Sequence, residues 1–178
     1  MKSVLNSCAI MNLSLIKEVI IMNNIIDLTK PVAEVVKEHP EIKAAASQIP
    51  WQLDDDFKEM LPIMQTDIML SSGGKTLIID AKYYEHSLQK QYDSYSVHSG
   101  NLYQIFTYVK NKEMELKNQD HESVSGMLLY AKTDEVVYPD HEYKMSGNTI
   151  AVRTLDLDKN FTEIKKQLDV IVEKYLQY

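Results

Sequence analysis

Residues 66–84 read TDIMLSSGGKTLIIDAKYY, and this stretch decides how the chain is organised. Residues 63–70 have the composition of a strand, the Ser-Ser-Gly-Gly run at 71–74 is typical of a hairpin turn, and residues 75–84 form a second strand. The second strand is apolar through residues 77–79, which indicates that it is covered on both faces. The sequence therefore predicts a hairpin whose second strand lies inside a sheet.

The second strand ends in a charged pair. Asp80 and Lys82 lie on the same face because side chains alternate along a strand, and Ala81 points the other way. Asp67 stands at the start of the preceding strand, so the hairpin brings it opposite this pair. We therefore expect two carboxylates and one ammonium group to converge at one end of the hairpin.

This arrangement is suited to binding a divalent cation. Two carboxylates that lie close together repel each other unless a positive charge sits between them, and Mg²⁺ prefers oxygen ligands. Asp67 and Asp80 are therefore predicted to bind Mg²⁺, with the backbone carbonyl of Ala81 as a further ligand. The metal would polarise a phosphoryl oxygen, while Lys82 would orient or deprotonate the attacking water. The pattern favours phosphodiester hydrolysis.

The alternative interpretation is a surface Asp–Lys ion pair, which contributes little to stability. An Asp-x-Lys triplet is common by chance. Its position at the end of an apolar, central strand argues against this alternative, because charges there are costly to leave unpaired.

A helix supplies two further candidate residues. Residues 101–115 have helical periodicity, and Gln104 and Tyr108 are four residues apart, so both project from one side of the helix. Gln104 is a candidate for orienting the water or a phosphate, with Tyr108 packed beneath it; an ordinary half-buried helix face is the alternative. Tyr83 and Tyr84 directly follow the lysine, and one of them is expected to border the site while the other packs in the core.

The remaining segments predict an α/β fold with a mixed sheet flanked by helices. The expected elements are an amphipathic helix at 9–22, a helix that begins near Pro31, a polar loop at 85–100, a strand at 124–131, a hairpin at 142–155 and a final helix at 158–175.

The composition restricts the class of protein. The chain has 178 residues, a formal net charge of −7 and one cysteine, Cys8, which is typical of a reducing cytoplasm. No stretch approaches the ~20 consecutive apolar residues that a membrane helix needs, so a soluble protein without membrane contact is expected. The negative charge argues against non-specific binding to nucleic acid, unless metal ions and a partner supply positive charge.

Three ordered motifs resemble one known family. They read LPIMQTDIMLSSGGKTLIIDAKYY at 61–84, SGNLYQIFTYVKN at 99–111 and VSGMLLYA at 124–131. Together they resemble the C-terminal nuclease domain of the McrC subunit of 5-methylcytosine-specific restriction systems, which belongs to the PD-(D/E)xK nuclease superfamily. The resemblance runs from about residue 40 to the C-terminus.

The resemblance implies a restriction-endonuclease-like αβββαβ core with an extra C-terminal hairpin and helix. Its first strand is expected near 48–54. The implied division is a helical, diverged or truncated N-terminal segment at 1–38, followed by a nuclease domain at 39–178.

The same resemblance assigns roles to individual residues. It implies metal-binding carboxylates at Asp67 and Asp80, a catalytic lysine at Lys82, and a helix motif formed by Gln104 and Tyr108. Thr66 stands where many superfamily members have proline.

The implied function is Mg²⁺-dependent cleavage of DNA together with a McrB-type AAA+ GTPase subunit. GTP would bind only to that partner, because the sequence has no glycine-rich phosphate-binding loop. Two alternatives stay open: a catalytically silent remnant that binds only DNA or a partner, and a structural metal or Ca²⁺ site, in which a lysine has no role.

Overall fold

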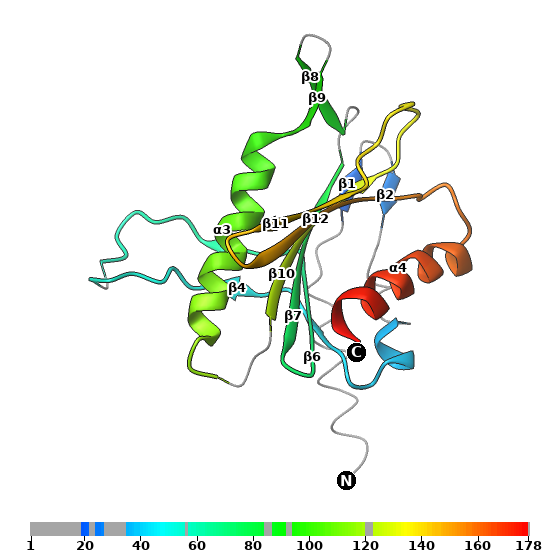
Figure 1. The fold of residues 1–178 in the computed structure, drawn as a ribbon. Helices are drawn as coiled ribbons and strands as arrows, with labels where there is room; N and C mark the ends of the chain where they lie inside the picture. The colour runs from blue at the N-terminus through cyan, green and yellow to red at the C-terminus, as the bar shows by residue number, and fades with distance from the viewer. Residues whose placement is uncertain are drawn as a thin grey trace.

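A six-stranded mixed sheet with one long helix on each face forms the centre of the molecule (Figure 1). The computed structural model describes residues 19–21, 24–26, 35–55, 57–83, 87–91, 94–119 and 123–177. In chain order, the strands of the large sheet are β3 (Lys43–Ala45), β6 (Ile68–Ser72), β7 (Lys75–Lys82), β10 (Ser123–Ala131), β11 (His141–Met145) and β12 (Asn148–Leu155).

The other described elements are short strand pairs and helices. The pairs are β1 (Val19–Ile21) with β2 (Asn24–Ile26), β4 (Gln48–Ile49) with β5 (Met64–Gln65), and β8 (Leu88–Gln91) with β9 (Ser94–Val97). The helices are a single turn at 35–38, α3 (Ser99–Leu116) and α4 (Phe161–Leu176).

The sheet order is β11-β12-β10-β7-β6-β3. Strand β10 is parallel to both β7 and β12, and α3 makes the crossover from β7 to β10 that a parallel pair requires. The remaining neighbours are antiparallel. The predicted fold class is confirmed: a helical turn, three strands, α3 and β10 form the αβββαβ core, and the β11–β12 hairpin with α4 completes it.

The two helices cover separate apolar cores. On one face, α3 buries Ile105 and Val109 against Ile78 of β7 and Leu128 of β10. At Gly126 the helix lies so close to the sheet that an added Cβ would be 2.7 Å from Val109 Cγ2. On the other face, α4 buries Leu168, Ile171, Val172 and Leu176. Phe161, at the start of the helix, is 46% exposed.

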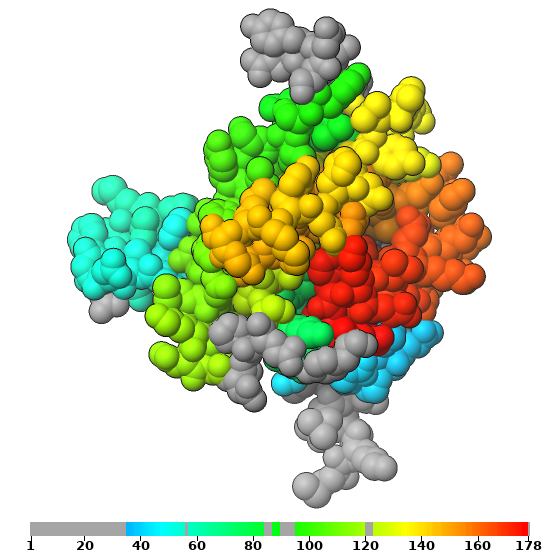
Figure 2. Space-filling model, viewed as in Figure 1, coloured from blue at the N-terminus to red at the C-terminus, as the bar shows by residue number. Residues whose placement is uncertain are grey.

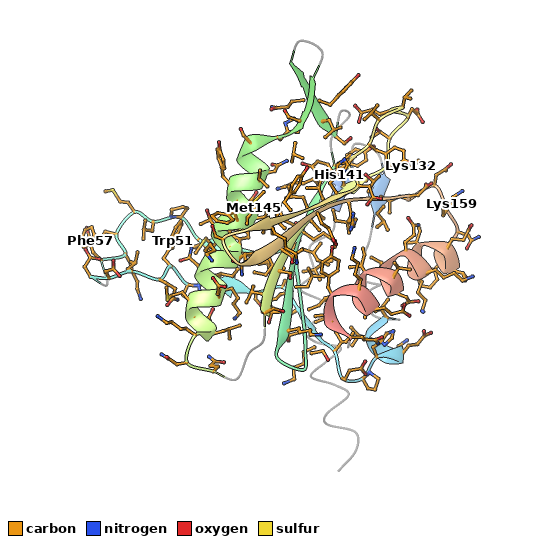
Figure 3. The ribbon with its side chains drawn as sticks, viewed as in Figure 1. Trp51, Phe57, Lys132, His141, Met145 and Lys159 are labelled. Carbon is orange, nitrogen blue, oxygen red and sulfur yellow. The ribbon has the colours of Figure 1, made fainter. Side chains whose placement is uncertain are left out.

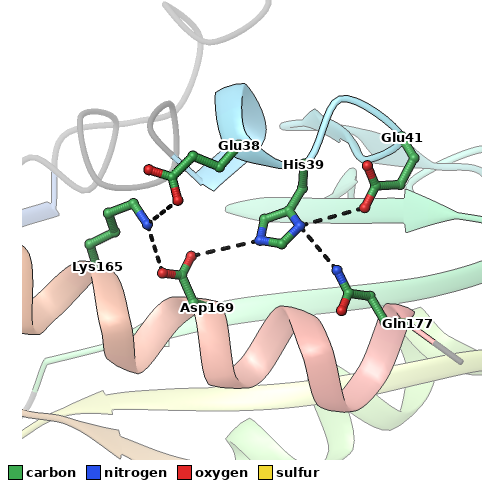
Figure 4. Close-up of polar contacts among 6 residues, drawn as sticks. All are labelled: Glu38, His39, Glu41, Lys165, Asp169 and Gln177. Carbon is green, nitrogen blue, oxygen red and sulfur yellow. Dashed lines mark hydrogen bonds and ion pairs between the residues drawn. The ribbon is translucent and has the colours of Figure 1, made fainter.

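A polar cluster fastens the start of the core to α4, along most of the length of that helix (Figure 4). Lys165 Nζ lies 2.6 Å from a Glu38 oxygen and 2.7 Å from an Asp169 oxygen. His39 Nδ1 lies 3.0 Å from Gln177 Nε2. These contacts hold the chain that precedes β3 on the α4 face of the sheet.

The first strand of the core is not where the resemblance placed it. Residues 48–54 were expected to form it, whereas β3 pairs with β6 at Lys43–Ala45. Of the expected range only Gln48–Ile49 is a strand, and it belongs to the separate β4–β5 pair. Pro50 has no amide hydrogen to donate to a ladder, so the chain leaves the sheet there. The strand expected at 63–70 likewise divides into β5 and β6.

Two other predicted elements are corrected. The segment 85–100 was expected to be a loop, but it contains the β8–β9 hairpin, in which Leu88 pairs with Val97. Its polar residues on both faces conceal the period of two that usually reveals a strand. The helix expected at 9–22 is wrong for its last residues, since Val19–Ile21 is a strand. The rest of that helix and its successor near Pro31 lie outside the described residues, apart from the turn at 35–38.

Candidate active site

The hairpin turn sets the register of the site. Gly73 and Gly74 have φ angles of 53° and 82°, which suit a two-residue turn with both residues in the left-handed region. This turn pairs Ile68 with Ile79, so the next residues along the two strands are Asp67 and Asp80. A shift of one residue would turn Asp67 to the opposite face of the sheet.

The side chain of Asp67 bonds to β7 just beyond the point where β6 stops pairing with that strand. Its Oδ2 accepts a hydrogen bond from the backbone N–H of Ala81 at 2.9 Å. The preceding residue, Thr66, is buried; its N–H donates to Ser47 O at 3.0 Å, and its Oγ1 accepts from Ser47 N at 3.2 Å. Thr66 thus holds Asp67 in place through hydrogen bonds, and sequence patterns alone did not reveal this.

Asp80 and Lys82 form a buried ion pair, not the surface pair of the alternative interpretation. Lys82 Nζ lies 2.6 Å from Asp80 Oδ2, and the two side chains are 15% and 5% exposed. Asp80 Oδ2 thus has the Lys82 ammonium as a close partner, and Asp67 lies near enough to influence the same carboxyl. A carboxylate oxygen has two lone pairs, so an oxygen that contacts one cation can still bind a second.

The surroundings of Asp80 disfavour its charged form. Burial raises the pKa of its carboxyl, Lys82 opposes this effect, and the nearby carboxylate of Asp67 adds to it. The two acids are thus close enough to interact, as the register of the hairpin implies. An added divalent cation would relieve both the burial cost and the repulsion.

The raised pKa predicts that Asp80→Asn stabilises the metal-free protein. The folded state holds the Asp80 proton more tightly than the unfolded state, so stability falls as the pH rises above the usual aspartate value of 3.8. Asparagine removes this cost, and the melting temperature in EDTA should therefore rise at pH 7 by a few degrees, with the difference shrinking towards pH 4. Thermal melts of both proteins across this range test the prediction; a variant that melts lower at pH 7 would contradict it.

Helix α3 brings the third part of the site. Lys82 Nζ donates to Gln104 Oε1 at 3.0 Å, and Gln104 Nε2 donates to the Tyr108 hydroxyl at 2.9 Å. Tyr108 is buried and Gln104 is partly buried, so the predicted pair does face the sheet. The contacts form one chain from Asp80 through Lys82 and Gln104 to Tyr108.

A second contact between α3 and the sheet was not foreseen. Asn101 Nδ2, in the first turn of α3, donates to the hydroxyl of Tyr130 at 3.0 Å, and both residues are buried. Tyr130 is the neighbour of Lys82 in the β7–β10 ladder. This bond therefore fixes the helix one turn before Gln104. No local pattern could have revealed it, because it depends on the register between two strands.

The remaining candidates belong to the segment that follows Lys82. Tyr83 is 43% exposed directly after Lys82, while Tyr84 falls outside the described residues. Ser87, a few residues on, is buried, and its N–H and Oγ both donate to Glu135 Oε2, at 2.8 and 2.7 Å. These bonds tie the segment after β7 to the loop after β10.

The donor set fits a hard cation. Within the described residues, no group of three or more His, Cys, Asp or Glu side chains is placed to hold a metal. Two carboxylates are nevertheless enough for Mg²⁺, which keeps several waters and shares substrate phosphates. Asp67 and Asp80 supply oxygen only, and they lie close enough for Asp67 to raise the pKa of Asp80, which is the setting that a divalent cation relieves.

Comparison with known proteins gives the family. The family model described as McrBC 5-methylcytosine restriction system component matches residues 32–131, which is more than half of the chain. The chain belongs to this McrBC family. The match contains Asp67, Asp80, Lys82 and Gln104, the residues that meet in the structure.

Two relatives of this McrBC family member extend the comparison. The chain is 32% identical over 144 residues to the Escherichia coli K12 protein named type IV methyl-directed restriction enzyme EcoKMcrBC; the match covers 79% of the chain and 40% of that protein. A solved half-complex of Thermococcus gammatolerans McrB AAA+ hexamers with bound McrC matches with a TM-score of 0.48 and 15% identity, over 79% of this chain and 31% of that one. The chain thus spans well under half the length of these relatives. No helix in the described ranges is both long and apolar enough to cross a membrane.

Proposed function

We propose that this chain is the nuclease component of a restriction system and hydrolyses phosphodiester bonds in DNA with the help of Mg²⁺. One observation carries the proposal: a buried carboxylate, Asp80, lies beside a second carboxylate, Asp67, and in contact with the ammonium group of Lys82. A protein that performs no reaction gains nothing from this arrangement, because burying charged groups lowers the stability of the fold.

The residues divide the work. Asp67, Asp80 and the carbonyl of Ala81 would hold Mg²⁺, which when bound polarises a phosphoryl oxygen and acidifies a water. Asp67 also accepts a hydrogen bond from the Ala81 N–H, which joins the residue before β6 to the last residues of β7. This hydrogen bond holds the two segments that carry the proposed ligands in place before substrate binds.

Lys82 would act on the water and on the charge that develops at phosphorus. Its ammonium group is compact and has three donors, one of which is directed to Gln104 Oε1. Gln104 in turn is held by Tyr108, so the ammonium is aimed by a partly buried chain of hydrogen bonds. Gln104 is thereby a positioning residue for Lys82.

The relatives suggest the biological setting. The Escherichia coli relative is named a methyl-directed restriction enzyme, which supports methylated DNA as the substrate. From the family resemblance we infer a McrB-type AAA+ GTPase subunit that binds GTP as the partner, and the cytoplasm as the location. The net charge of −7 supports a role for that partner, because the chain itself carries little positive charge to attract DNA phosphates. The same charge also favours the second candidate, a partner-binding module without cleavage activity.

Calorimetric titration of Mg²⁺ and Ca²⁺ into the chain separates these two functions. The wild-type chain should bind either ion with millimolar or tighter affinity, alone or with a short duplex, and Asp80→Asn should abolish the binding because one of two carboxylate ligands is lost. Glu173→Gln, on α4, is the matched control. Binding by the wild type and Asp80→Asn alike, or by neither with duplex present, would contradict the proposed metal site and favour the module.

A further inference from the structure

The loop at 50–63 stands out from the body of the protein. It leaves β4 and returns to β5, and it forms a separate lobe beside α3, away from α4 (Figures 1 and 2). Figure 3 shows Trp51 near the helix and Phe57 at the outer end of the loop. The proposed active site makes no use of this segment.

Large apolar side chains gather on the 50–63 loop without being buried. The side chains of Phe57, Ile63 and Leu61 are 62%, 72% and 39% exposed, and Met60 is fully exposed. Four such residues within seven positions are unusual on a monomeric protein, where exposed apolar residues are normally scattered. A cluster of this kind marks a surface that another molecule covers.

The base of the loop is tied to the core. The indole N–H of Trp51 donates to Pro62 O at 2.7 Å and so joins the two ends of the loop. Gln52 N donates to Asn111 Oδ1 of α3 at 2.8 Å, and Asn111 Nδ2 donates back to the helix at Thr107 O. The loop is therefore carried by the same helix that carries Gln104.

The outer end of the loop has a defined conformation. Phe57 N donates to Asp55 Oδ1 at 3.1 Å, and Leu61 N donates to Lys58 O at 3.3 Å. Met60 has a φ of 62°, a left-handed conformation that costs a residue other than glycine about 1 kcal/mol. This conformation turns its whole side chain into solvent, where it gains nothing in the free protein.

The charges around the apolar residues restrict the possible partner. Asp54, Asp55 and Glu59 are exposed on the loop, against a single cation, Lys58. Acidic side chains repel DNA phosphates and anionic lipid headgroups, so neither surface suits the loop. A protein with an apolar pocket and lysine or arginine side chains at its rim fits both features.

We propose that the 50–63 loop docks into such a pocket on the GTP-hydrolysing subunit. The identity of this partner rests on the proposed function, whereas the surface follows from exposure and charge. Asn111 lies seven residues beyond Gln104, a separation of about 10 Å along α3. A partner seated on the loop would thus hold a segment that is hydrogen-bonded to the helix that aims Lys82.

The test compares binding of three forms of the chain to the purified GTPase subunit, by biolayer interferometry with GTP present. Phe57→Ser/Met60→Ser/Ile63→Ser should weaken binding at least about 30-fold, because exposed apolar anchors dominate interface affinity. Val136→Ser/Val170→Ser removes apolar side chains that are 95% and 62% exposed elsewhere and should bind like the wild type. Raising the salt concentration should weaken wild-type binding, because the rim contacts are ionic.

The outcomes are distinct. Equal affinity of the loop variant and the wild type overturns the proposal, and so does a wild-type chain that does not bind the GTPase subunit. If sedimentation shows a wild-type dimer that the loop substitutions dissociate, the loop's occupant is a second copy, which also overturns it. Mg²⁺ binding by the loop variant should equal that of the wild type; this readout depends on the proposed active site alone and keeps the two proposals separate.

Discussion

Lys82→Ala is expected to lower the rate of Mg²⁺-dependent DNA cleavage by about 10³-fold, the scale found when one preorganised charge-stabilising donor is removed. Lys82 is the cation that lies both 2.6 Å from Asp80 Oδ2 and 3.0 Å from Gln104 Oε1. Alanine removes this hydrogen-bond donor and also leaves the buried carboxylate of Asp80 without the positive charge of Lys82. Cleavage of a methylated duplex, measured with the GTPase subunit present, provides the rate.

Two further variants make this result specific. Lys132→Ala removes a lysine that is paired with Asp156 on the surface, and it should cleave at the wild-type rate. Lys82→Arg keeps the positive charge, but its planar guanidinium cannot reproduce the compact ammonium between Asp80 and Gln104, so the rate should stay low. A Lys82→Ala protein that cleaves as fast as the Lys132→Ala control would rule out the catalytic assignment.

Gly126→Val is expected to destabilise the fold more than any other single change considered for this protein. A Cβ at Gly126 would lie 2.7 Å from Val109 Cγ2, 2.8 Å from Ile105 Cγ1 and 3.1 Å from Ile150 Cδ1. Val109, Ile105 and Ile150 are fully buried, so none can move without displacing its neighbours. Alanine alone should cost about 1–3 kcal/mol through overpacking, and valine, with two more methyl groups, should cost more.

Urea denaturation followed by circular dichroism measures this loss. Gly100→Ala is the matched control, because no atom lies within 4 Å of a Cβ placed there and the residue is in α3. That change should leave the stability the same or raise it slightly, since alanine favours a helix over glycine and Gly100 lies in the first turn of α3. If Gly126→Ala has the stability of the wild type, the helix is not packed against β10 as closely as described.

The Gly126 variants also test whether the packing of α3 against β10 affects DNA cleavage. Helix α3 reaches the sheet at Gly126 and again where Asn101 meets Tyr130, and Gln104 lies on the same helix. A helix raised from β10 would carry Gln104 away from Lys82. Gly126→Ala should therefore reduce cleavage more than its loss of stability alone explains.

Local patterns were sufficient to predict much of the catalytic end of the protein. Gly73 and Gly74 permit a tight turn because glycine has no Cβ to hinder a positive φ, and strand alternation places Asp80 and Lys82 together. The period of 3.6 places Gln104 and Tyr108 on one side of α3. These features depend on neighbouring residues, so the sequence by itself determined them.

The tertiary structure decided what those side chains meet. Lys82 and Gln104 are 22 residues apart, and their hydrogen bond exists only because α3 crosses back over the sheet close to β10. The first core strand at Lys43–Ala45 likewise depends on pairing with β6 across a long insertion. Burial, which raises the pKa of Asp80, is a property of the assembled core. Residue spacing sets which groups share a face, but only long-range packing sets their distances and removes them from water.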